Sequence, residues 1–389
     1  MSTLEQDFHL AGGGPLADAL SRVRIGRPLL PAPRRAVVVA LLVWVPALIL
    51  ASAQGVALPG LVRIPFLLDP EAYARYLISL PLFVLAEVGI DQACRGAVEH
   101  FVRSGLVPQG EVPKLRSLLA LAERRRSSVP AAAVIAVLAV APLFYQAQLG
   151  LETELHGTWY LIQGGTRLSL AGAWTYFVGQ GILRYVILGW IWRLAIWAML
   201  LSRTTMLDLT PMPSHPDRAA GFGFLGLTQA RFAVLAFAAS TGVSGAIARD
   251  LIFEGAKLSP RFVPLAIYVA ALTALLLLPL VAPAPRLFRI RRQGIFDYGV
   301  LAAEYSQRFD RKWVRSGSEP GADLLGTEDI QSLADLGQTV ERIQAIRMVP
   351  IDRAGLISIA LAAAAPMVPL MLIDPEARVL VTEMLRKLL

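Results

Sequence analysis

The chain has 389 residues, of which 55% are hydrophobic and only 17% are charged, and its mean hydropathy is +0.56. A soluble globular domain carries about 25% charged residues, so this composition excludes an ordinary water-soluble protein. The net charge of +8 would suit nucleic acid, but the basic residues flank apolar segments, so no nucleic-acid partner is expected. The single cysteine, Cys94, excludes an internal disulfide framework and a cysteine-rich metal site.

Seven apolar segments are long enough, at roughly 20 residues each, to cross the hydrocarbon core of a bilayer. They predict an all-α polytopic membrane bundle with about seven spans, at residues 36–57, 76–93, 129–149, 173–201, 224–248, 262–283 and 354–373. The second is the least regular, because it contains Pro81, Glu87 and Asp91. The seventh contains Pro366 and Pro369, so a re-entrant or tilted segment is an alternative there.

A ladder of charged residues runs through the second span at intervals of four: Glu87, Asp91, Arg95, Glu99 and Arg103. Residues four apart are neighbours on a helix, so Asp91–Arg95 and Glu99–Arg103 can pair. Glu87 lies deepest and has no partner on its own helix. Such a group must face the bundle interior or water, so Glu87 and Asp91 either bind a cation or relay protons, or form an interhelical clasp with Arg184 or Arg193 of the fourth span.

The fourth span carries both of those arginines. Trp190, Arg193 and Trp197 are three and four residues apart, so the Arg193 guanidinium can stack on indole faces and anchor the helix at the inner interface. Arg184 lies mid-helix, roughly three turns from the cytoplasmic end of the span. It either pairs with Glu87 or Asp91 or faces a path for anions.

Between the fourth and fifth spans, the loop that contains His215, Asp217 and Arg218 is stiffened by Pro211, Pro213 and Pro216. Its HPD tripeptide lacks the two soluble basic helices of a J-domain, so that function is rejected. Two candidate ligands are too few for a closed metal site, and no metal or cofactor is expected. Asp217 is expected to cap the helix that enters the membrane. The alternative is that the loop forms a cytoplasmic mouth, at which His215 would titrate near neutral pH.

Outside the spans, the sequence predicts three further elements. Residues 94–128 are interpreted as a helix that continues from the second span. Residues 286–353 begin with a basic stretch expected along the anionic inner surface, followed by a helix with an apolar face that must be buried against a neighbouring helix or another subunit. On the other side, residues 158–172 resemble a β-hairpin, and residues 374–389 a short amphipathic helix.

The domain organisation follows from these elements: an N-terminal segment over 1–35, a six-span bundle over 36–283 that includes helix 94–128, a helical segment over 284–353, and a last span with its tail over 354–389. Lys and Arg concentrate in the N-terminal segment and in 94–128 and 284–353. The positive-inside rule then predicts a cytoplasmic N-terminus and an external C-terminus. The Arg- and Ala-rich composition is typical of a bacterial inner-membrane protein.

Three stretches, HPDRAAGFGFLG, DIQSLADLGQTVERIQAIRMVP and LRYVILGWIWRLAIW, together resemble an uncharacterised family of bacterial multi-pass membrane proteins with the pattern HPD-x-x-GGLGFL. The resemblance covers the chain from about residue 75 to the end. Ala220 and Phe222 replace the Gly and Leu of the pattern. The family has no assigned activity, so the resemblance implies a fold and a loop position and no chemistry.

These features favour a transporter or channel for an ion or small solute, with Glu87, Asp91, Arg95, Arg184 and the 215–218 loop in its cytoplasmic half. The alternative is a scaffold or accessory subunit that docks a cytoplasmic protein, or a second copy, through 286–353. A membrane enzyme acting on a lipid at the inner leaflet is the third possibility; the nucleotide-binding, zinc-protease and nucleophile-elbow motifs are absent from the sequence, so an enzyme is the less favoured class.

Overall fold

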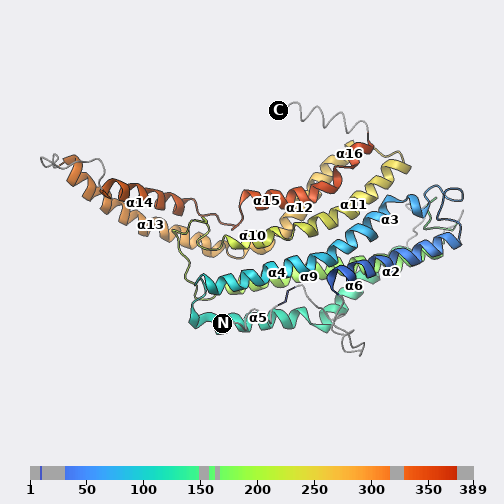
Figure 1. Ribbon diagram of the computed structural model, residues 1–389, viewed down its shortest axis with the longest axis horizontal. Helices are drawn as coiled ribbons and strands as arrows, with labels where there is room; N and C mark the ends of the chain where they lie inside the picture. Colours follow the sequence, from blue (N-terminus) through green and yellow to red (C-terminus); the bar gives the residue numbers. More distant parts are fainter. Residues whose placement is uncertain (1–8, 11–30, 149–156, 163–166, 316–327, 375–389) are drawn as a thin grey trace.

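The structure is a computed structural model and describes residues 9–10, 31–148, 157–162, 167–315 and 328–374. Six helical segments are long and apolar enough to cross a membrane, and a seventh span is present if a pair of helices bent by 42° is counted as one. Figure 1 shows these helices side by side along the long axis of the molecule. The chain is therefore a multi-pass membrane protein.

The described chain folds into a series of helices. The principal ones are α2 (Ala32–Ala53), α3 (Pro70–Tyr73), α4 (Leu80–Arg103), α5 (Val112–Arg126), α6 (Val129–Gln148), α8 (Leu170–Ala173), α9 (Gln180–Thr204), α10 (Phe224–Ala230), α11 (Ala233–Phe253), α12 (Phe262–Leu277), α13 (Ala284–Phe309), α14 (Glu328–Gln344), α15 (Arg353–Ala364) and α16 (Leu370–Ile373). The C-terminal span, Arg353–Ile373, is a helix interrupted by a single 3₁₀ turn at Pro366.

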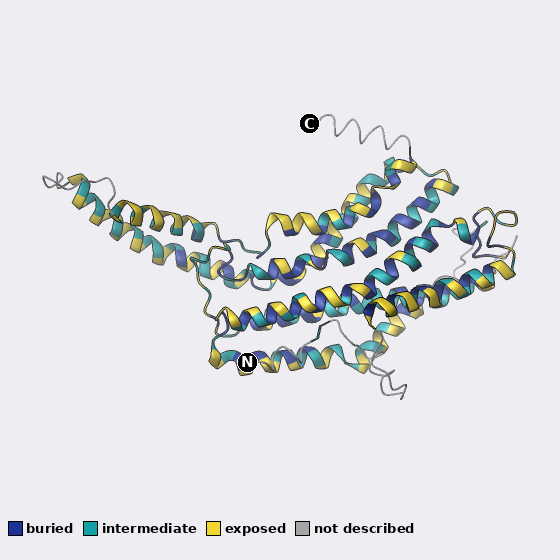
Figure 2. Cartoon of the chain, viewed as in Figure 1, coloured by how far each residue is buried: buried dark blue, intermediate teal, exposed yellow. Residues whose placement is uncertain are grey.

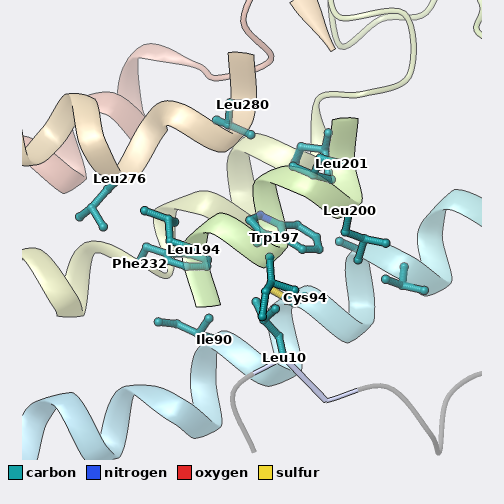
Figure 3. Packing of buried hydrophobic residues seen from close by; sticks show 14 of the residues in the cluster. Leu10, Ile90, Cys94, Leu194, Trp197, Leu200, Leu201, Phe232, Leu276 and Leu280 are labelled. Carbon is teal, nitrogen blue, oxygen red and sulfur yellow. The ribbon is translucent and has the colours of Figure 1, made fainter. Parts of the chain in front are cut away.

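Helices α4, α9 and α11 form the centre of the bundle, and the other spans surround them. Helix α2 packs on α4, α6 packs on α9, and α15 packs on α11 and α12. Figure 3 shows the core where α4 and α9 meet, with Cys94, Leu194 and Trp197 inside it. The outward faces of α2, α6 and α12 carry exposed apolar side chains such as Val37, Val137 and Ile267 (Figure 2), as expected of surfaces covered by lipid.

Two of the spans begin in the same way, 100 residues apart, which the sequence did not indicate. Asp69 and Ser169 cap the one-turn helices α3 and α8. Each turn leads into six residues of π-helix, Ala74–Ser79 and Trp174–Gly179, and then into the long helices α4 and α9. π-helical turns are rare and are frequently found at functional sites.

The second span is consequently longer than the sequence predicts. The continuous helical segment is Pro70–Arg103, with 34 residues, or about 51 Å at 1.5 Å per residue. A hydrocarbon core is about 30 Å thick, so this segment extends beyond it. The predicted span begins at residue 76, after the charged residues Glu71 and Arg75.

The prediction of a single helix over residues 94–128 is wrong, because α4 ends at Arg103 and a separate helix, α5, begins at Val112. The chain reverses direction after Arg103. Helix α5 then packs along the end of α9 that the sequence predicts to be cytoplasmic, and a bend connects it to α6. Val112, Leu115 and Leu119 on α5 are buried in the central core. The apolar positions between the basic residues of this segment therefore form a packed helix of their own.

Helices α13 and α14 form a hairpin that extends away from the end of the bundle (Figure 1). Leu333, Leu336 and Val340 of α14 are half-buried, and Ile343 is fully buried against Gly294 of α13. The neighbouring helix required by the apolar face of α14 is thus α13. Helix α13 leads outward instead of lying across the end of the bundle, unlike the expected surface helix.

The predicted β-hairpin over 158–172 is not confirmed. Within the described residues there is no strand, and the segment contributes only isolated bridges, Leu161 with Leu168 and Thr158 with Ile64. Residues 163–166, and the predicted tail helix from residue 375 onward, lie outside the described residues.

A tight contact between α11 and α3 supplies a test of this packing. A methyl group added at Gly245 would overlap Ala74 and press on the backbone of Glu71, whereas a methyl group at Gly189 of α9 has open space. We expect Gly245→Ala to destabilise the protein by about 1–3 kcal/mol through overpacking. Gly189→Ala, the matched control, should be neutral or stabilising by up to about 1 kcal/mol through helix propensity. Thermal unfolding in detergent measures both; equal effects would contradict the packing.

Candidate functional site

The Glu87 cluster, which comprises Arg35, Glu87 and Arg193, joins three spans. The Glu87 carboxylate accepts hydrogen bonds from Arg35 of α2, at 2.7 Å, and from Arg193 of α9, at 3.1 Å. The Arg193 guanidinium also lies 4.9 Å from the ring centre of Trp190. Of the two clasp partners considered for Glu87, the structure selects Arg193 and adds Arg35, which the sequence argument had not considered.

The depth of this cluster follows from α2, whose apolar run begins directly after Arg35. Because Arg35 contacts Glu87, Glu87 lies level with the start of α2. Helix α6 begins near the same level, since Trp192 of α9 donates to the backbone of Arg125 just before it. Glu87 is therefore at one edge of the apolar layer, and the rest of the charged ladder continues beyond that edge.

The Asp91 triad, made of His9, Asp91 and Arg95, lies one turn further along α4. Asp91 is 3.0 Å from Arg95 and 2.9 Å from His9 Nδ1. The predicted pairing within the helix is confirmed, and the N-terminal segment contributes His9. The next pair, Glu99 and Arg103, also forms, on the exposed surface.

The Glu71 cluster lies at the opposite end of the same span and was not predicted. It contains Glu71, Arg75 and Arg249, with Asp69 beside them. The Glu71 carboxylate, only 4% exposed, pairs with Arg75 at 2.5 Å and with Arg249 of α11. Glu71 and Arg249 are 178 residues apart, so only the fold brings them together. The sequence feature that could have indicated this cluster is the four-residue spacing of Glu71 and Arg75 next to an apolar run.

Asp69 links this cluster to the loop before α8. Its carboxylate caps α3 through the Glu71 backbone N–H and accepts a hydrogen bond of 2.8 Å from the indole of Trp159. Burial raises the pKa of the Asp69 carboxyl, and the nearby Glu71 carboxylate adds to the effect, against the hydrogen bonds that favour the charged form. The end of the bundle at which α3 and α8 begin is thus held by buried polar contacts.

The two π-helical segments meet between the Glu71 and Glu87 clusters. The Tyr76 hydroxyl, in the first segment, lies 3.5 Å from the Thr175 carbonyl oxygen in the second. One turn away, the Ser79 hydroxyl donates to the Ala238 carbonyl of α11 at 2.7 Å. Arg184 of α9 is half-buried and interacts electrostatically with Tyr176. Glu87 pairs with Arg35 and Arg193 and not with Arg184, which the sequence had offered as an alternative partner.

The loop before α10 is organised around Asp217. Its carboxylate accepts hydrogen bonds from the backbone N–H groups of Ala219, Gly221 and Gly223 at 2.8, 3.2 and 2.8 Å, and it lies 2.9 Å from His215 Nδ1. These donors precede Phe224, the first residue of α10, so Asp217 braces the loop and does not cap the helix as expected. Ala220 adopts the left-handed backbone, with φ of 53°, which glycine adopts more readily.

We expect the protein to lose stability in acid as Asp217 becomes protonated. Burial acts to raise the pKa of this carboxyl, but the three backbone donors and His215 outweigh it, and the pKa lies below its usual value. A lowered folded-state pKa gives stability that is present above the unfolded pKa of about 3.9 and is lost as the pH falls through the folded value.

We therefore expect Asp217→Asn to cost roughly 1–3 kcal/mol at pH 7 and to lose less stability than the parent protein between pH 5 and 3. Chemical unfolding in detergent across this range measures the difference. An unchanged pH profile in Asp217→Asn would show that this carboxylate does not hold the loop.

The chain gives no match to protein-family models, to curated proteins or to solved structures. Among the described residues, no group of three or more His, Cys, Asp or Glu side chains is placed to hold a metal ion. The features that bear on function are therefore the three ionic arrangements, the π-helical segments and the Asp217 loop.

Proposed function

We propose that the chain is a transporter or channel for an ion or small solute, closed at both ends in the described conformation. The observation that carries the proposal is that one span, Pro70–Arg103, is tied by ion pairs at both of its ends. Glu71 holds it to α11 near one surface, and Glu87 holds it to α9 and α2 near the other. Such contacts can close a pathway and separate when it opens, because their partners belong to different helices.

The π-helical segments between the two clusters support this proposal. A π-helical turn leaves the regular hydrogen-bond ladder, and backbone that departs from the α-helix at membrane depth is tolerated where it is buried in protein or lines a cavity. Here two such segments face one another through Tyr76 and Thr175, with Arg184 on the following helix. We propose that the pathway passes this point and that Arg184 favours anions within it.

Flux into proteoliposomes tests the proposal, with chloride, potassium and protons as probes. We expect the parent protein to conduct at least one of them above empty vesicles, and Arg184→Gln and Glu87→Gln to change the rate or the selectivity. Arg308→Gln, on the exposed surface of α13, is the matched control. Flux at the level of empty vesicles, or the same flux in all variants, would reject the pathway.

A second candidate function, docking of a partner protein on the predicted cytoplasmic side, is favoured by the α13–α14 hairpin. Phe296 and Val300 of α13 are 66% and 63% exposed on an element that extends away from the bundle. Leu333 and Leu336 face α13 and are unsuitable as test positions. In-cell crosslinking tests this function: Phe296→Glu with Val300→Glu should remove a specific adduct that Arg308→Gln retains.

A further inference from the structure

A basic cavity separates the Asp217 loop from the segment that leads into α15. Its volume is about 730 Å³, and it is lined by Pro216, Asp217, Arg218, Ala345, Arg347 and Arg353. Three arginines thus line one hollow together with a single acidic residue, Asp217. That carboxylate is already bound by three backbone N–H groups of its own loop, so the positive charge predominates.

The cavity is held in shape by Arg347. Its guanidinium donates to the carbonyl oxygens of Asp217 and Ile351 at 2.9 and 2.8 Å, and its backbone N–H donates to the Arg218 carbonyl at 2.8 Å. The loop therefore cannot separate from the 347–351 segment without breaking two of these bonds, those to the carbonyl oxygens of Asp217 and Arg218. The Nε of Arg347 is buried and has no hydrogen-bond partner in the described structure, which leaves one donor unsatisfied beside the cavity.

Arg218 and Arg353 supply charge that nothing else in the described part of the chain neutralises. Both side chains are exposed, and neither forms an ion pair with a described residue. The nearest carboxylate on the α15 side, Asp352, caps α15 through the Gly355 N–H at 2.8 Å. Arginine side chains with free forked donors are suited to bind phosphate oxygens in pairs.

The position of the cavity also indicates the ligand. Arg353 is the first residue of the C-terminal span, and Phe224 begins the span that follows the Asp217 loop six residues after Arg218. The mouth of the cavity is therefore at the level at which two helices enter the apolar layer, where lipid phosphates lie. Basic pockets between spans on the cytoplasmic side are typical sites for anionic headgroups.

We propose that this cavity binds a phosphate group, carried by a lipid headgroup or by a soluble phosphorylated compound, with Arg218 and Arg353 as its ligands and Arg347 as the brace and third positive charge. The inference does not depend on transport. A phosphate site here would give a role to the loop that the sequence singled out and to Arg218, which forms no ion pair with a described residue.

Thermal unfolding of the full chain in a neutral detergent tests the site, at constant ionic strength to hold screening equal. The probes are short-chain phosphatidic acid, inorganic phosphate and, as a lipid without net charge, phosphatidylcholine of the same chain length. A ligand that binds only the folded state raises the unfolding temperature with concentration. We expect phosphatidic acid or phosphate to do so and phosphatidylcholine to have no effect.

Substitutions test whether Arg218 and Arg353 bind the phosphate group. Arg218→Gln with Arg353→Gln should weaken the apparent affinity by about tenfold or more, since each lost charge-assisted contact removes a substantial part of the binding energy. Arg292→Gln with Arg308→Gln, which removes the same charge from exposed positions on α13, should leave the affinity unchanged. If the first double variant fails to fold, the single Arg353→Gln is scored in the same way.

The outcomes separate the two sources of phosphate. Stabilisation by phosphatidic acid at concentrations at which inorganic phosphate has no effect identifies a lipid headgroup, and equal stabilisation by both identifies a soluble phosphate. No stabilisation by either probe would overturn the site. So would a loss of affinity of the same size in the α13 control.

Discussion

Replacing Glu71 by alanine is expected to destabilise the protein by about 3–5 kcal/mol, because it removes the carboxylate that Arg75 and Arg249 share in a buried site and leaves Arg249 only the longer contact with Asp250, at 3.5 Å. Glu71 is 4% exposed and pairs with both Arg75 and Arg249. The guanidinium of Arg249 is itself largely buried, and its Nε has no hydrogen-bond partner in the described structure. The measurement is the free energy of unfolding in detergent.

The control for Glu71→Ala is Glu254→Ala, at the end of α11 nearest the cluster. Glu254 is exposed, so its removal should change stability by no more than about 0.5 kcal/mol. Replacing Glu71 by glutamine, which keeps the shape and part of the hydrogen bonding, should lie between the two. A Glu71→Ala variant as stable as Glu254→Ala would show that the cluster does not hold α3 against α11.

The second large effect is expected at Glu87. Glu87→Ala should cost about 2–4 kcal/mol, less than Glu71→Ala, because Arg35 at the end of α2 can turn toward solvent while Arg193 cannot. Glu99→Ala is the matched control on the same helix, since its pair with Arg103 is exposed and worth at most about 1 kcal/mol. Equal losses from the two substitutions would place Glu87 at the surface, against its observed burial.

The clusters together explain how charged side chains are accommodated in so apolar a chain. An isolated charge among lipid-facing helices is costly, and pairing between helices reduces that cost. Here the paired acids lie at the two edges of the apolar layer, and the interior retains Arg184, which interacts with Tyr176. A path through the bundle would therefore meet a closed contact at each end and a polar region between them.

The sequence predicts much of this fold because long apolar runs have few alternatives to spanning helices. Residues such as Val129 and Phe262 begin spans where the hydropathy changes, and the ladder that starts at Glu87 falls on one helix as its spacing indicates. The apolar face of α14 also predicted its need for a partner. These features depend on local periodicity, which a single sequence contains.

The features that the sequence did not predict depend on contacts between distant segments. Nothing in the neighbourhood of Glu71 indicates Arg249, and Arg35 was counted only as loop charge that orients the chain. The π-helical segments share a tyrosine at equivalent positions, Tyr76 and Tyr176, but little else in sequence. Their common π-helical conformation is therefore visible only in the structure. Asp217 was recognised as a structural residue, but its three backbone donors depend on the left-handed turn at Ala220.

The most direct test of the central claim, that ionisable groups within the spans hold helices to one another, is a double-mutant cycle between Glu87 and Arg193. The free energy of unfolding is measured for Glu87→Ala, Arg193→Ala and the double variant. We predict a coupling energy of about 1.5–3 kcal/mol, as for neighbours in one ionic network. Additivity within about 0.5 kcal/mol, the behaviour of independent sites, would contradict the claim and remove the proposed closure of the bundle at that end.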